Sequence, residues 1–425
     1  MRIATITGFR RKVGGVEGYL DEVIPELHRA GHETALFTEY DGPANRDLIS
    51  ISADSQGFCV AELGRRGAIS ALRDWRPDLI YSHGLNDPDI EVETLSIAPS
   101  VFFVHGYHGT CISGDKTFKF PTIRPCSRVF GPACLALYFP RRCGGRSPVT
   151  MARLYLLQKK RLALMRKYRA IVTASEHMRA ECLKHGLAPE RVEKSLYLID
   201  TGRMMLDESM EGALAVTNEG AAPSGSSYRL LFSGRMDRLK GGLLLLQTLP
   251  IVADRLERPV ELTMAGDGLA RLKWNHVAEK ISSSDSRISI RFPGWLNEKQ
   301  LDAIARQSDL LVVPSLWPEP FGRVGPEAGL RHLPVAAFAV GGIPEWLAPG
   351  INGYLAPGDP PTAHGLANAI VECLRDPAKH ARLRQGAFRV AQRFSLKAHL
   401  KQLLRLFAEV VGNAEWPQAA HSNLI

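Results

Sequence analysis

The stretch that decides the fold is PSLWPEPFGRVGPEA, residues 314–328. It follows the apolar run at 310–313, which is typical of a buried parallel strand. Pro326 favours a helix that begins there, because proline is tolerated in the first helical turn. Between strand and helix lies a Pro- and Gly-rich loop that carries Glu319, and Glu327 stands at the start of the helix. In an open α/β fold both acids would face the crevice at the carboxyl end of the sheet, where ligands bind.

The chemistry of this stretch suits a sugar bound next to an anion. Carboxylates such as Glu319 and Glu327 accept hydrogen bonds from paired sugar hydroxyls. Helix N-terminal amides near Val324 and Gly325 would favour an anion in the same crevice. The alternative is a solvated loop acid followed by a helix-start acid that the helix dipole favours.

The stretch resembles the signature of the retaining glycosyltransferases of family 4, in which seven residues separate Glu319 from Glu327 within Pro-Ser…Glu-Pro-Phe-Gly…Glu-Ala. The later segments 333–345 and 350–355 are similar to the same family in order and spacing. The resemblance implies an α/β protein with the GT-B fold, in which two Rossmann-like domains face each other across a cleft. It also implies transfer of a sugar from a nucleotide-diphosphate sugar to an acceptor hydroxyl, with retention of configuration, in glycan, polysaccharide or glycolipid biosynthesis.

Length and composition agree with a multidomain globular protein. The 425 residues predict two to three domains, at roughly 150 residues per domain. The sequence is 45% hydrophobic and 23% charged, and its formal charge of +9 permits an anionic partner without identifying one. No apolar run is long enough for a transmembrane helix. The chain enters a strand pattern directly after Met1, so we expect no signal peptide and a cytoplasmic location.

The chain divides into four parts. A stretch rich in Gly, Ala, Ser and Pro predicts an interdomain linker, and a helical stripe of apolar residues near the end predicts a helix that the resemblance places across the N-terminal domain. The predicted parts are 1–205, an acceptor-binding Rossmann-like domain with a Cys-rich basic insertion at about 106–150; 206–227, the linker; 228–395, a nucleotide-sugar-binding Rossmann-like domain; and 396–425, the crossover helix and tail.

The N-terminus has the pattern of a βαβ unit. A strand at 3–7 precedes the glycine-containing loop 8–18 and a helix, and a second strand follows at 34–38. Glycines such as Gly15 before a helix let backbone amides approach a phosphate, although tight turns also need glycine. The resemblance implies that this loop lies against the donor diphosphate and the acceptor.

The second domain opens with a strand at 228–232, followed by Gly234, Arg235 and, five residues later, Lys240. Arginine can bind phosphate oxygens with two hydrogen bonds, and lysine adds a point charge. The resemblance implies that these two cations neutralise the departing diphosphate, an electrostatic contribution that is usually the largest in catalysis. The alternative is two loop cations in a basic protein.

The resemblance assigns further roles. His105, at the end of a strand at 101–104, would contact the donor sugar, which makes His105, Arg235, Lys240 and Glu319 the predicted catalytic set. His83, at the end of another strand, is interpreted as structural or acceptor-side. Two cations and helix amides would replace a metal, so we expect no cofactor to be required for catalysis. No residue is a convincing covalent nucleophile, which favours front-face attack assisted by the leaving phosphate.

The predicted donor-binding set extends beyond the catalytic residues. Glu319 would contact sugar hydroxyls, the backbone at Phe321 and Gly322 would fix the ring, and Glu327 would bind the ribose hydroxyls. The full set is Gly15, Gly234, Phe321, Gly322, Val324, Gly325 and Glu327.

Four cysteines cluster in the insertion. A structural zinc site formed by four thiolates could hold together a loop-rich segment, but the spacing contains no Cys-x₂-Cys pair. Ordinary buried thiols are the alternative, and disulfides are disfavoured in a reducing cytoplasm. The candidate ligands are Cys111, Cys126, Cys134 and Cys143.

From residue 116 to 169 the sequence has many lysines and arginines and no acid. Apolar residues alternate with the basic ones around 151–167, and such a helix can lie on an anionic membrane. The alternatives are a solvated basic face and a nucleic-acid surface, and we discount nucleic acid because no recognised module accompanies the charge. The resemblance implies a nucleotide-sugar donor and a sugar, glycolipid or polyprenyl-linked acceptor as partners, and the basic stretch adds the inner face of a membrane.

Two other functions fit the same fold. One is a nucleotide-sugar epimerase or a phosphorylase. The other is a non-catalytic protein that binds nucleotides or glycans. The presence of Arg235, Lys240, Glu319 and Glu327 together argues against the non-catalytic alternative, because a decayed site would be expected to lose some of them.

Overall fold

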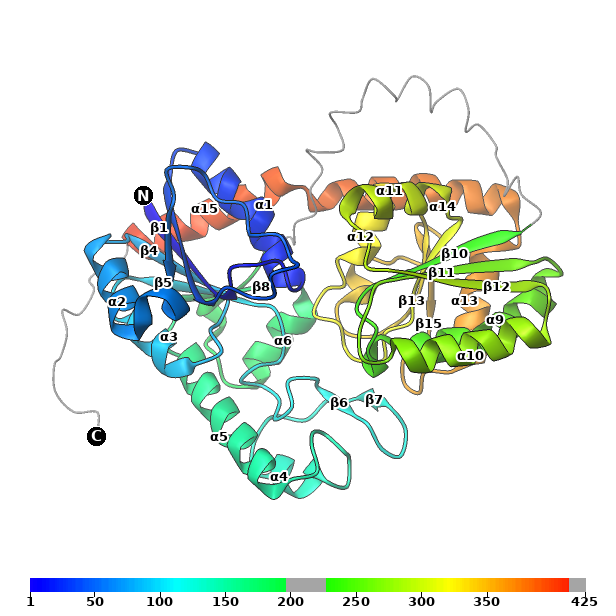
Figure 1. Ribbon diagram of the computed structural model, residues 1–425, viewed down its shortest axis with the longest axis horizontal. Helices are drawn as coiled ribbons and strands as arrows, with labels where there is room; N and C mark the ends of the chain where they lie inside the picture. Colours follow the sequence, from blue (N-terminus) through cyan, green and yellow to red (C-terminus); the bar gives the residue numbers. More distant parts are fainter. Residues whose placement is uncertain (196–226, 413–425) are drawn as a thin grey trace.

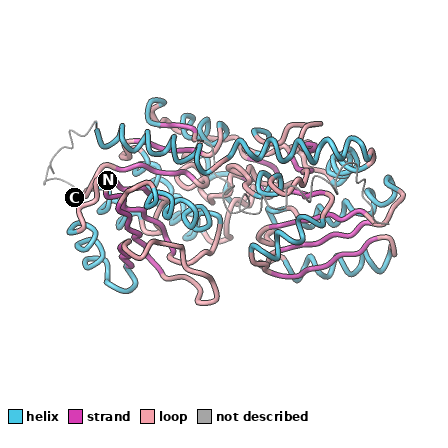
Figure 2. The backbone as a smooth tube through the Cα atoms, turned by 90° about the horizontal axis from the view of Figure 1, so that it is seen from above, coloured by secondary structure: helices cyan, strands magenta, loops and turns pink. Residues whose placement is uncertain are grey.

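The computed structural model describes residues 1–195 and 227–412, which form two α/β domains side by side (Figure 1). Each domain contains one parallel sheet, and helices cover the sheets on both sides (Figure 2). This confirms the predicted class of two Rossmann-like domains. Near-continuous apolar strands explain the arrangement, because a strand covered on both faces must be apolar on both. The central residues of the first strand, 3–8, are all buried.

The N-terminal sheet has the strand order β3-β2-β1-β4-β5-β8-β9, and all its neighbouring strands are parallel. Its strands are β1 (Arg2–Phe9), β2 (Glu33–Tyr40), β3 (Gln56–Cys59), β4 (Leu79–Ser82), β5 (Ser100–Val104), β8 (Ala170–Thr173) and β9 (Val192–Lys194). Its helices are α1 (Gly15–Arg29), α2 (Val60–Asp74), α3 (Pro88–Leu95), α5 (Pro148–Met165), α6 (Glu176–Lys184) and the short η1 (Pro189–Arg191).

The C-terminal sheet has the order β12-β11-β10-β13-β14-β15, again parallel throughout. Its strands are β10 (Tyr228–Ser233), β11 (Val260–Ala265), β12 (Ile288–Gly294), β13 (Leu310–Val313), β14 (Val335–Phe338) and β15 (Gly353–Ala356). Its helices are α9 (Gly242–Leu256), α10 (Arg271–Ser284), α11 (Glu298–Gln307), α12 (Val324–Gly329), α13 (Ala363–Leu374) and α14 (Pro377–Ala391), with the short η3 (Arg238–Lys240), η4 (Ile343–Glu345) and η5 (Gln392–Phe394).

The strand orders locate the places where a ligand can bind. In each sheet the order reverses between two adjacent strands, β1 and β4 in the first and β10 and β13 in the second. Loops leave the carboxyl ends of these strands in opposite directions, which opens a crevice at each reversal. The loop after β10 carries Lys240, and the loop after β13 carries Glu319. The fold therefore brings these two residues to one crevice.

The predicted insertion forms a small subdomain beside the first sheet (Figure 1). It contains the antiparallel pair β6 (Thr117–Phe118) and β7 (Arg124–Pro125) and the helix α4 (Ala133–Tyr138), and it leads into α5. Its own buried cluster is small and consists of Ile112, Phe130, Tyr138 and Cys143.

The last described helix, α15 (Leu396–Gly412), packs on the N-terminal domain (Figure 1). The Tyr19 hydroxyl on α1 lies 2.7 Å from His399 Nε2 on α15, and the rings of Tyr81 and Phe407 meet at 5.0 Å. Strand β10 begins at Tyr228 and α15 at Leu396, the positions where the sequence predicted the second domain and the final helix to begin. Apart from Ser227, the predicted linker 206–227 lies outside the described residues, as does the tail 413–425.

Candidate active site

A cavity of about 610 Å³ lies between the two domains. The N-terminal domain contributes the loops that follow β1, β4 and β5, together with one side of α5. The C-terminal domain contributes the loop after β10 and the indole of Trp317. The charged and histidine side chains from both domains that line it are Glu17, His83, Glu91, His105, His108, Asp115, Lys119, Arg161, Arg235, Asp237, Arg238 and Lys240.

Lys240 and Glu319 form the central pair of the site. The Lys240 ammonium donates to Glu319 Oε1 at 2.6 Å, and the Ser315 hydroxyl donates to the same oxygen at 2.5 Å. Glu319 is buried, so its carboxylate depends on these two donors to offset the loss of water. The Asp237 side chain in turn accepts hydrogen bonds from the backbone amides of Leu239 and Lys240. These bonds hold η3, and with it the backbone of Lys240, in place.

The backbone around Glu319 is fixed by the glycine pair at 341–342. The Gly342 amide donates to the Glu319 carbonyl oxygen at 2.7 Å. Gly341 has a φ of +60°, and a Cβ there would lie 2.1 Å from the same oxygen. Only glycine permits this approach. The later segment of the family pattern therefore supports the loop that carries the predicted catalytic acid, Glu319.

The predicted donor-binding loop is supported from behind by Trp346. Its indole N–H donates to the Phe321 carbonyl oxygen at 2.7 Å. A Cβ on Gly325 would lie 1.9 Å from the indole ring, and Gly322 has a φ of +86°. The helix α12 begins at Val324, two residues before the predicted start at Pro326. The prediction was wrong on this point, because residues 324 and 325 already adopt helical conformation ahead of the proline.

Glu327 lies apart from the Lys240–Glu319 pair. It accepts a hydrogen bond from Arg323 Nε at 2.8 Å, and the other arm of this arginine donates to Glu22 on α1 at 2.7 Å. Arg323 thus bridges the two domains. Neither Glu327 nor Gly15 contributes to the described lining of the cavity. A Cβ added at Gly15 would meet no atom within 4 Å, which leaves open space beside the start of α1.

Arg235 lines the cavity from a more exposed position. Its side chain is 75% exposed, and its Nε donates to Asp237 at 2.8 Å. Exposed ion pairs of this kind contribute at most about 1 kcal/mol, so the guanidinium can turn toward an anion. The preceding turn is tightly packed, because a Cβ at Gly266 would lie 2.0 Å from the Gly234 carbonyl oxygen.

His105 stands at the carboxyl end of β5, next to His83. His105 Nε2 lies 2.7 Å from His83 Nδ1, and the His105 ring stacks on Phe103 with centroids 4.5 Å apart. Burial lowers the pKa of His105 to about 3, with smaller contributions from the positive charges of Arg323 and His399. The imidazole is therefore neutral at physiological pH and can exchange hydrogen bonds with a sugar hydroxyl. Of the predicted catalytic set, His105, Arg235 and Lys240 line the cavity, and Glu319 lies directly behind Lys240.

Sequence reasoning did not single out two residues that belong to this site. Arg238 lines the cavity two residues before Lys240 and donates to the Lys119 carbonyl oxygen in the insertion. Trp317 lines it with a ring whose centroid lies 5.5 Å from the Lys240 ammonium. Both lie inside stretches that the sequence had already marked, so position within a motif was the available signal.

The four cysteines of the insertion are free thiols in the described structure. Within residues 1–195 and 227–412 no group of three or more His, Cys, Asp or Glu side chains is placed to hold a metal ion. Burial, with smaller contributions from the three other cysteines, raises the pKa of the Cys143 thiol to about 12, whereas zinc binds thiolates. None of the four is in a disulfide. The structure therefore gives no support to zinc at Cys111, Cys126, Cys134 and Cys143, and ordinary thiols are the arrangement that it describes.

Four of the five basic residues at the end of α5 are exposed, namely Lys159, Lys160, Arg166 and Lys167, and Lys160 also pairs with Asp89. Arg161 is half-buried, lines the cavity and donates to the Asn86 carbonyl oxygen at 3.0 Å. The helix around 151–167, which the sequence predicted to lie on a membrane, therefore includes one residue of the site, Arg161.

Two family models match the chain. One, described as Glycosyltransferase Family 4, matches residues 13–194, and the other, described as Glycosyl transferases group 1, matches residues 227–376. The first match covers most of the N-terminal domain, and the second covers the C-terminal sheet with the cations and the acid of the site.

Curated relatives align with part of the chain. The D-inositol 3-phosphate glycosyltransferase of Salinispora arenicola is 32% identical over 242 residues, which are 55% of this chain and 52% of the relative. That of Corynebacterium glutamicum is 30% identical over 187 residues, 43% of each chain. The chain thus spans about half or less of the length of these relatives.

Solved structures match nearly the whole chain. Sucrose-phosphate synthase from Thermosynechococcus elongatus has a TM-score of 0.68 at 18% identity, over 97% of this chain and 100% of that one. HepE of Anabaena, solved in complex with UDP and glucose, has a TM-score of 0.63 at 20% identity, over 96% and 100%. At these identities the likeness concerns the fold, and it confirms the predicted one.

Proposed function

Because the chain belongs to glycosyltransferase family 4, we propose that it transfers a sugar from a nucleoside-diphosphate sugar to an acceptor hydroxyl. The observation that carries this proposal is the hydrogen-bonded pair of Lys240 and the buried Glu319 at the edge of an interdomain cavity. A lysine and two arginines beside one such acid suit a ligand that joins a diphosphate to a sugar. The epimerase, phosphorylase and non-catalytic alternatives have no separate observation in their favour.

In the proposed reaction the positive charges act on the leaving group. Arg235 and Lys240 face the cavity from the loop after β10 and would neutralise the diphosphate as the bond to the sugar breaks. Glu319 would orient Lys240 and accept hydrogen bonds from sugar hydroxyls. Neutral His105 would hold the sugar from the opposite domain. Lys240 and Glu319 are held by their mutual hydrogen bond and need little rearrangement during the reaction, whereas the exposed Arg235 would turn toward the diphosphate.

We propose that the reaction retains the anomeric configuration. The carboxylates that line the cavity are Glu17, Glu91, Asp115 and Asp237. Glu91 accepts hydrogen bonds from Tyr168 and Ser82, Asp115 pairs with Lys119, and Asp237 holds η3. Burial raises the pKa of Glu17, so none of the four is assigned the role of nucleophile. The acceptor oxygen would then attack from the face that the diphosphate leaves. The bond from the anomeric carbon to phosphate breaks, the bond to the acceptor forms, and the acceptor proton passes to the leaving phosphate oxygen.

The names of the relatives and solved structures suggest which donors and acceptors to test first. HepE was solved with UDP and with UDP-glucose, so uridine nucleotides are the first donors to test. The curated relatives are named for transfer to D-inositol 3-phosphate, which makes a polyol phosphate the first acceptor to test. Sugars, glycolipids and polyprenyl-linked glycans are the wider acceptor class.

A donor screen tests the proposal. UDP, GDP and ADP would be compared by thermal shift, because a ligand at 100 times its Kd stabilises the fold by about 2.7 kcal/mol. The sugar nucleotides of the stabilising base would then be incubated with and without acceptor, and ¹H NMR would report the product and its anomeric form. A new α- or β-glycoside with the donor configuration is expected. A changed free nucleotide sugar would indicate an epimerase instead, and stabilisation by none of the nucleotides would contradict the proposal.

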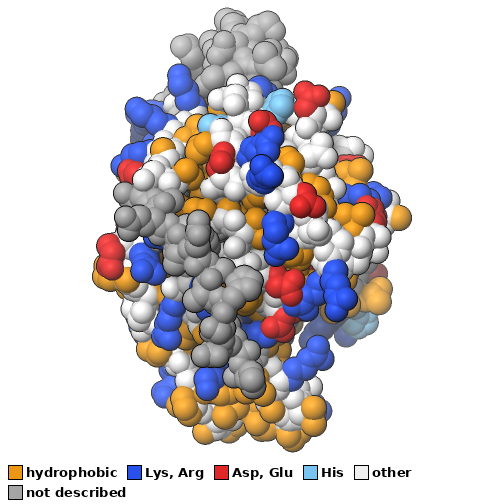
Figure 3. Space-filling model, turned by 90° about the vertical axis from the view of Figure 1, so that its left-hand side faces the viewer, with side chains coloured by type: hydrophobic (Ala, Val, Ile, Leu, Met, Phe, Trp, Pro, Cys, Tyr) orange, Lys and Arg blue, Asp and Glu red, His pale blue; other side chains and the backbone are white. Residues whose placement is uncertain are grey.

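We further propose that the enzyme works at the inner face of a membrane, docked through the end of the N-terminal domain formed by α4 and the start of α5. Figure 3 shows hydrophobic side chains gathered at the lower end of the molecule, where α4 and α5 lie in Figure 1, with lysines and arginines nearby. The large exposed apolar residues of this segment are Phe120, Val129, Phe139, Val149 and Leu156. The exposed arginines among them are Arg124, Arg128, Arg142, Arg146 and Arg153.

Each basic residue near an anionic surface contributes on the order of 1 kcal/mol, so this end combines charge with apolar contact. In the described part of the chain every helix is too short or too polar to cross a bilayer. Docking would place the cavity, which this domain partly lines, near a lipid-linked acceptor.

A further inference from the structure

Tyr107 reaches across the domain boundary to the loop that carries Glu319. The residue follows β5 in the N-terminal domain and is fully buried. Its hydroxyl donates to the carbonyl oxygen of Pro318, directly before Glu319, at 2.7 Å. Its ring also packs against the ring of Trp317 in a T-shaped arrangement, with the two centroids 6.0 Å apart. One side chain of the first domain therefore contacts both residues that precede the acid.

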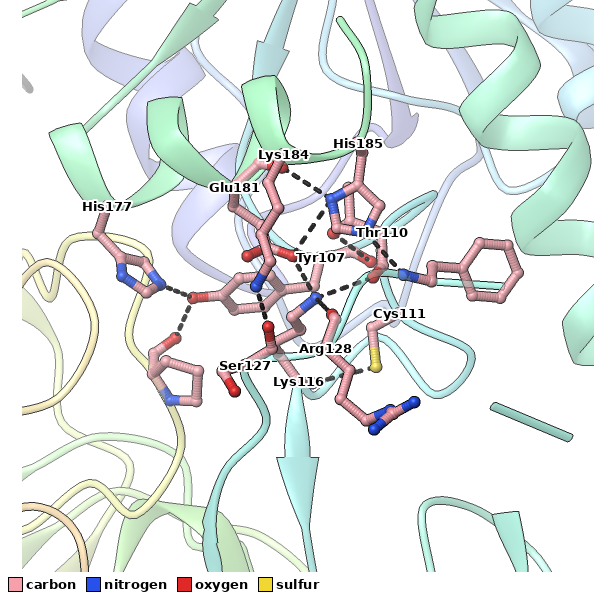
Figure 4. Close-up of polar contacts among 12 residues, drawn as sticks. Tyr107, Thr110, Cys111, Lys116, Ser127, Arg128, His177, Glu181, Lys184 and His185 are labelled. Carbon is pink, nitrogen blue, oxygen red and sulfur yellow. Dashed lines mark hydrogen bonds and ion pairs between the residues drawn. The ribbon is translucent and has the colours of Figure 1, made fainter. Parts of the chain in front are cut away.

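A neighbouring histidine contacts the same tyrosine hydroxyl, and the donor and acceptor roles of the two contacts can be assigned. His177 on α6 places its Nε2 2.8 Å from the Tyr107 oxygen, and Figure 4 shows the two side chains pointing toward each other. A phenol has one proton, which is directed to Pro318, so the tyrosine oxygen accepts from the imidazole N–H. Burial raises the pKa of Tyr107 well above its ordinary value, with smaller contributions from Glu181 and Glu319. The hydroxyl therefore keeps its proton and remains a donor.

Ser175 makes the matching contact on the other side of the acid. Its hydroxyl accepts from the Met178 amide at 3.1 Å and donates to the carbonyl oxygen of Pro320 at 2.5 Å. Ser175 is fully buried at the N-terminus of α6. The carbonyl oxygens of the two residues that flank Glu319, Pro318 and Pro320, thus each accept one hydrogen bond from the N-terminal domain.

A third contact holds the same helix against the C-terminal domain. The Glu345 carboxylate accepts hydrogen bonds from the backbone amides of Glu176 and His177, each at 2.9 Å. Lys194 lies 2.9 Å from the same carboxylate. Because α6 is tied to the second domain here, Tyr107 and Ser175 are held at fixed positions relative to the loop.

We propose that Tyr107 and Ser175 are positioning residues for Glu319. Their hydrogen bonds to the Pro318 and Pro320 carbonyl oxygens fix the peptide that carries the acid, so the N-terminal domain sets the catalytic geometry of the C-terminal one. The inference rests on the proposed glycosyl transfer. According to this inference, the buried hydroxyls of Tyr107 and Ser175 affect the chemical step and do not affect nucleotide binding.

The test uses Tyr107→Phe in the full chain, because this change removes the hydroxyl and keeps the ring. With the sugar nucleotide that wild type turns over fastest in the donor screen, kcat should fall by about 10- to 100-fold, since a displacement of about 1 Å can reduce a rate by about that factor. The KM for that donor and the Kd for its nucleoside diphosphate should stay within about twofold, because the lost hydrogen bond goes to the Pro318 backbone and not to Arg235 or Lys240. Hydrogen–deuterium exchange of segment 316–322 should become faster.

The matched control is Tyr228→Phe, which removes another buried hydroxyl, one directed at the Leu374 carbonyl oxygen within the C-terminal domain. Its kcat and its exchange in 316–322 should equal those of wild type. Ser175→Ala should change both quantities in the same direction as Tyr107→Phe. Wild-type kcat and exchange in Tyr107→Phe would overturn the inference, as would a loss of nucleotide affinity equal to the loss of kcat. Failure of the proposed function is distinguishable, because wild type itself would then turn over no donor, while the exchange measurement would still report on the loop.

Discussion

Lys240 and Glu319, 79 positions apart in the chain, are joined by a hydrogen bond of 2.6 Å at the point where the strand order of the second sheet reverses. The two residues to which the sequence assigned separate roles, phosphate neutralisation and sugar contact, therefore act as one unit. A change in either leaves the other without its charge partner. Because Glu319 is buried and Lys240 is a quarter exposed, the acid depends on the pair more than the lysine does.

Replacing the lysine should separate phosphate binding from nucleoside binding. Lys240→Ala should weaken UDP binding by about tenfold or more while the affinity for uridine changes little, because the lost partner is a phosphate oxygen. Calorimetric titration of both ligands checks this. The matched control is Lys379→Ala, which removes a lysine paired with Glu372 elsewhere in the C-terminal domain. Equal losses of UDP and uridine affinity would place Lys240 away from the diphosphate.

The insertion is anchored by a buried ion pair. Lys116, on the loop before β6, meets the carboxylate of Glu181 on α6, and both side chains are more than nine-tenths buried. The Lys116 ammonium also donates to the carbonyl oxygens of Thr110 and Arg128 (Figure 4). Lys116→Met should lower the free energy of unfolding by about 3–5 kcal/mol, because it leaves a buried carboxylate unpaired.

Urea denaturation measures this effect and its partner dependence. The double variant Lys116→Met/Glu181→Leu should recover much of the loss, because no charge then remains buried. Lys379→Met, at an exposed pair, should change the free energy of unfolding by about 1 kcal/mol or less. A Lys116→Met loss no larger than that of Lys379→Met would show that the buried pair does not hold the insertion.

His105 predicts a pH dependence of stability. Its pKa in the folded protein is about 3, below the ordinary value of 6.5. The unfolded chain therefore binds more protons between these two values, and the free energy of unfolding should fall as pH is lowered through that window and be unaffected above it. His105→Asn should show a shallower fall in urea denaturation midpoint between about pH 7 and about pH 5. His83 beside it remains in both proteins, and its pKa is lowered mainly by burial and further by the charge of His105, so the variant should relieve part of that shift as well. Parallel pH curves for the two proteins would contradict the assignment.

The docking end of the N-terminal domain predicts salt-dependent membrane binding. Wild type should sediment with vesicles containing phosphatidylserine and not with phosphatidylcholine alone, and high salt should release it as the Debye length falls from about 10 Å at 0.1 M to about 3 Å at 1 M. Replacing Arg142, Arg146 and Arg153 with glutamine should abolish binding and spare UDP affinity, since these residues are exposed and outside the cavity lining.

The control for this experiment removes as many charges elsewhere. Lys273, Lys280 and Arg382 are exposed in the C-terminal domain, and glutamine there should leave vesicle binding unchanged. Arg161 is left intact in both variants because it lines the cavity. Wild-type protein that ignores anionic vesicles at low salt would remove the membrane proposal.

Much of the fold could be predicted because its central strands are apolar on both faces. Strands β1, β2, β5 and β10 lie where the sequence predicted them, each a few residues longer or shifted by about one residue. Strands β3 and β9 were not predicted. They lie at the two edges of the first sheet, and their sequences, QGFC and VEK, are too short and too polar to give a strand pattern.

The site divides in a similar way. Arg235, Lys240 and Glu319 were found because motifs carry them, but their mutual geometry depends on contacts between distant segments. The Lys240–Glu319 bond is an example, and the bond from Tyr107 to Pro318, 211 positions away, is another. A buried tyrosine leaves no periodic signal that distinguishes a cross-domain donor from core packing. The pairing of Glu327 with Arg323 is local and at helical spacing, so it was open to prediction.

The central claim is that the Lys240–Glu319 pair serves sugar transfer, and Glu319→Gln tests it most directly. This change keeps the side-chain volume and a hydrogen-bond acceptor for Lys240 but removes the charge. The measurement is the release of nucleoside diphosphate from the donor that wild type uses, with circular dichroism and nucleotide affinity measured on the same samples. The account predicts a turnover lower by about 100-fold or more, in a folded protein whose affinity for the nucleoside diphosphate is close to that of wild type. Turnover by Glu319→Gln at the wild-type rate would contradict it.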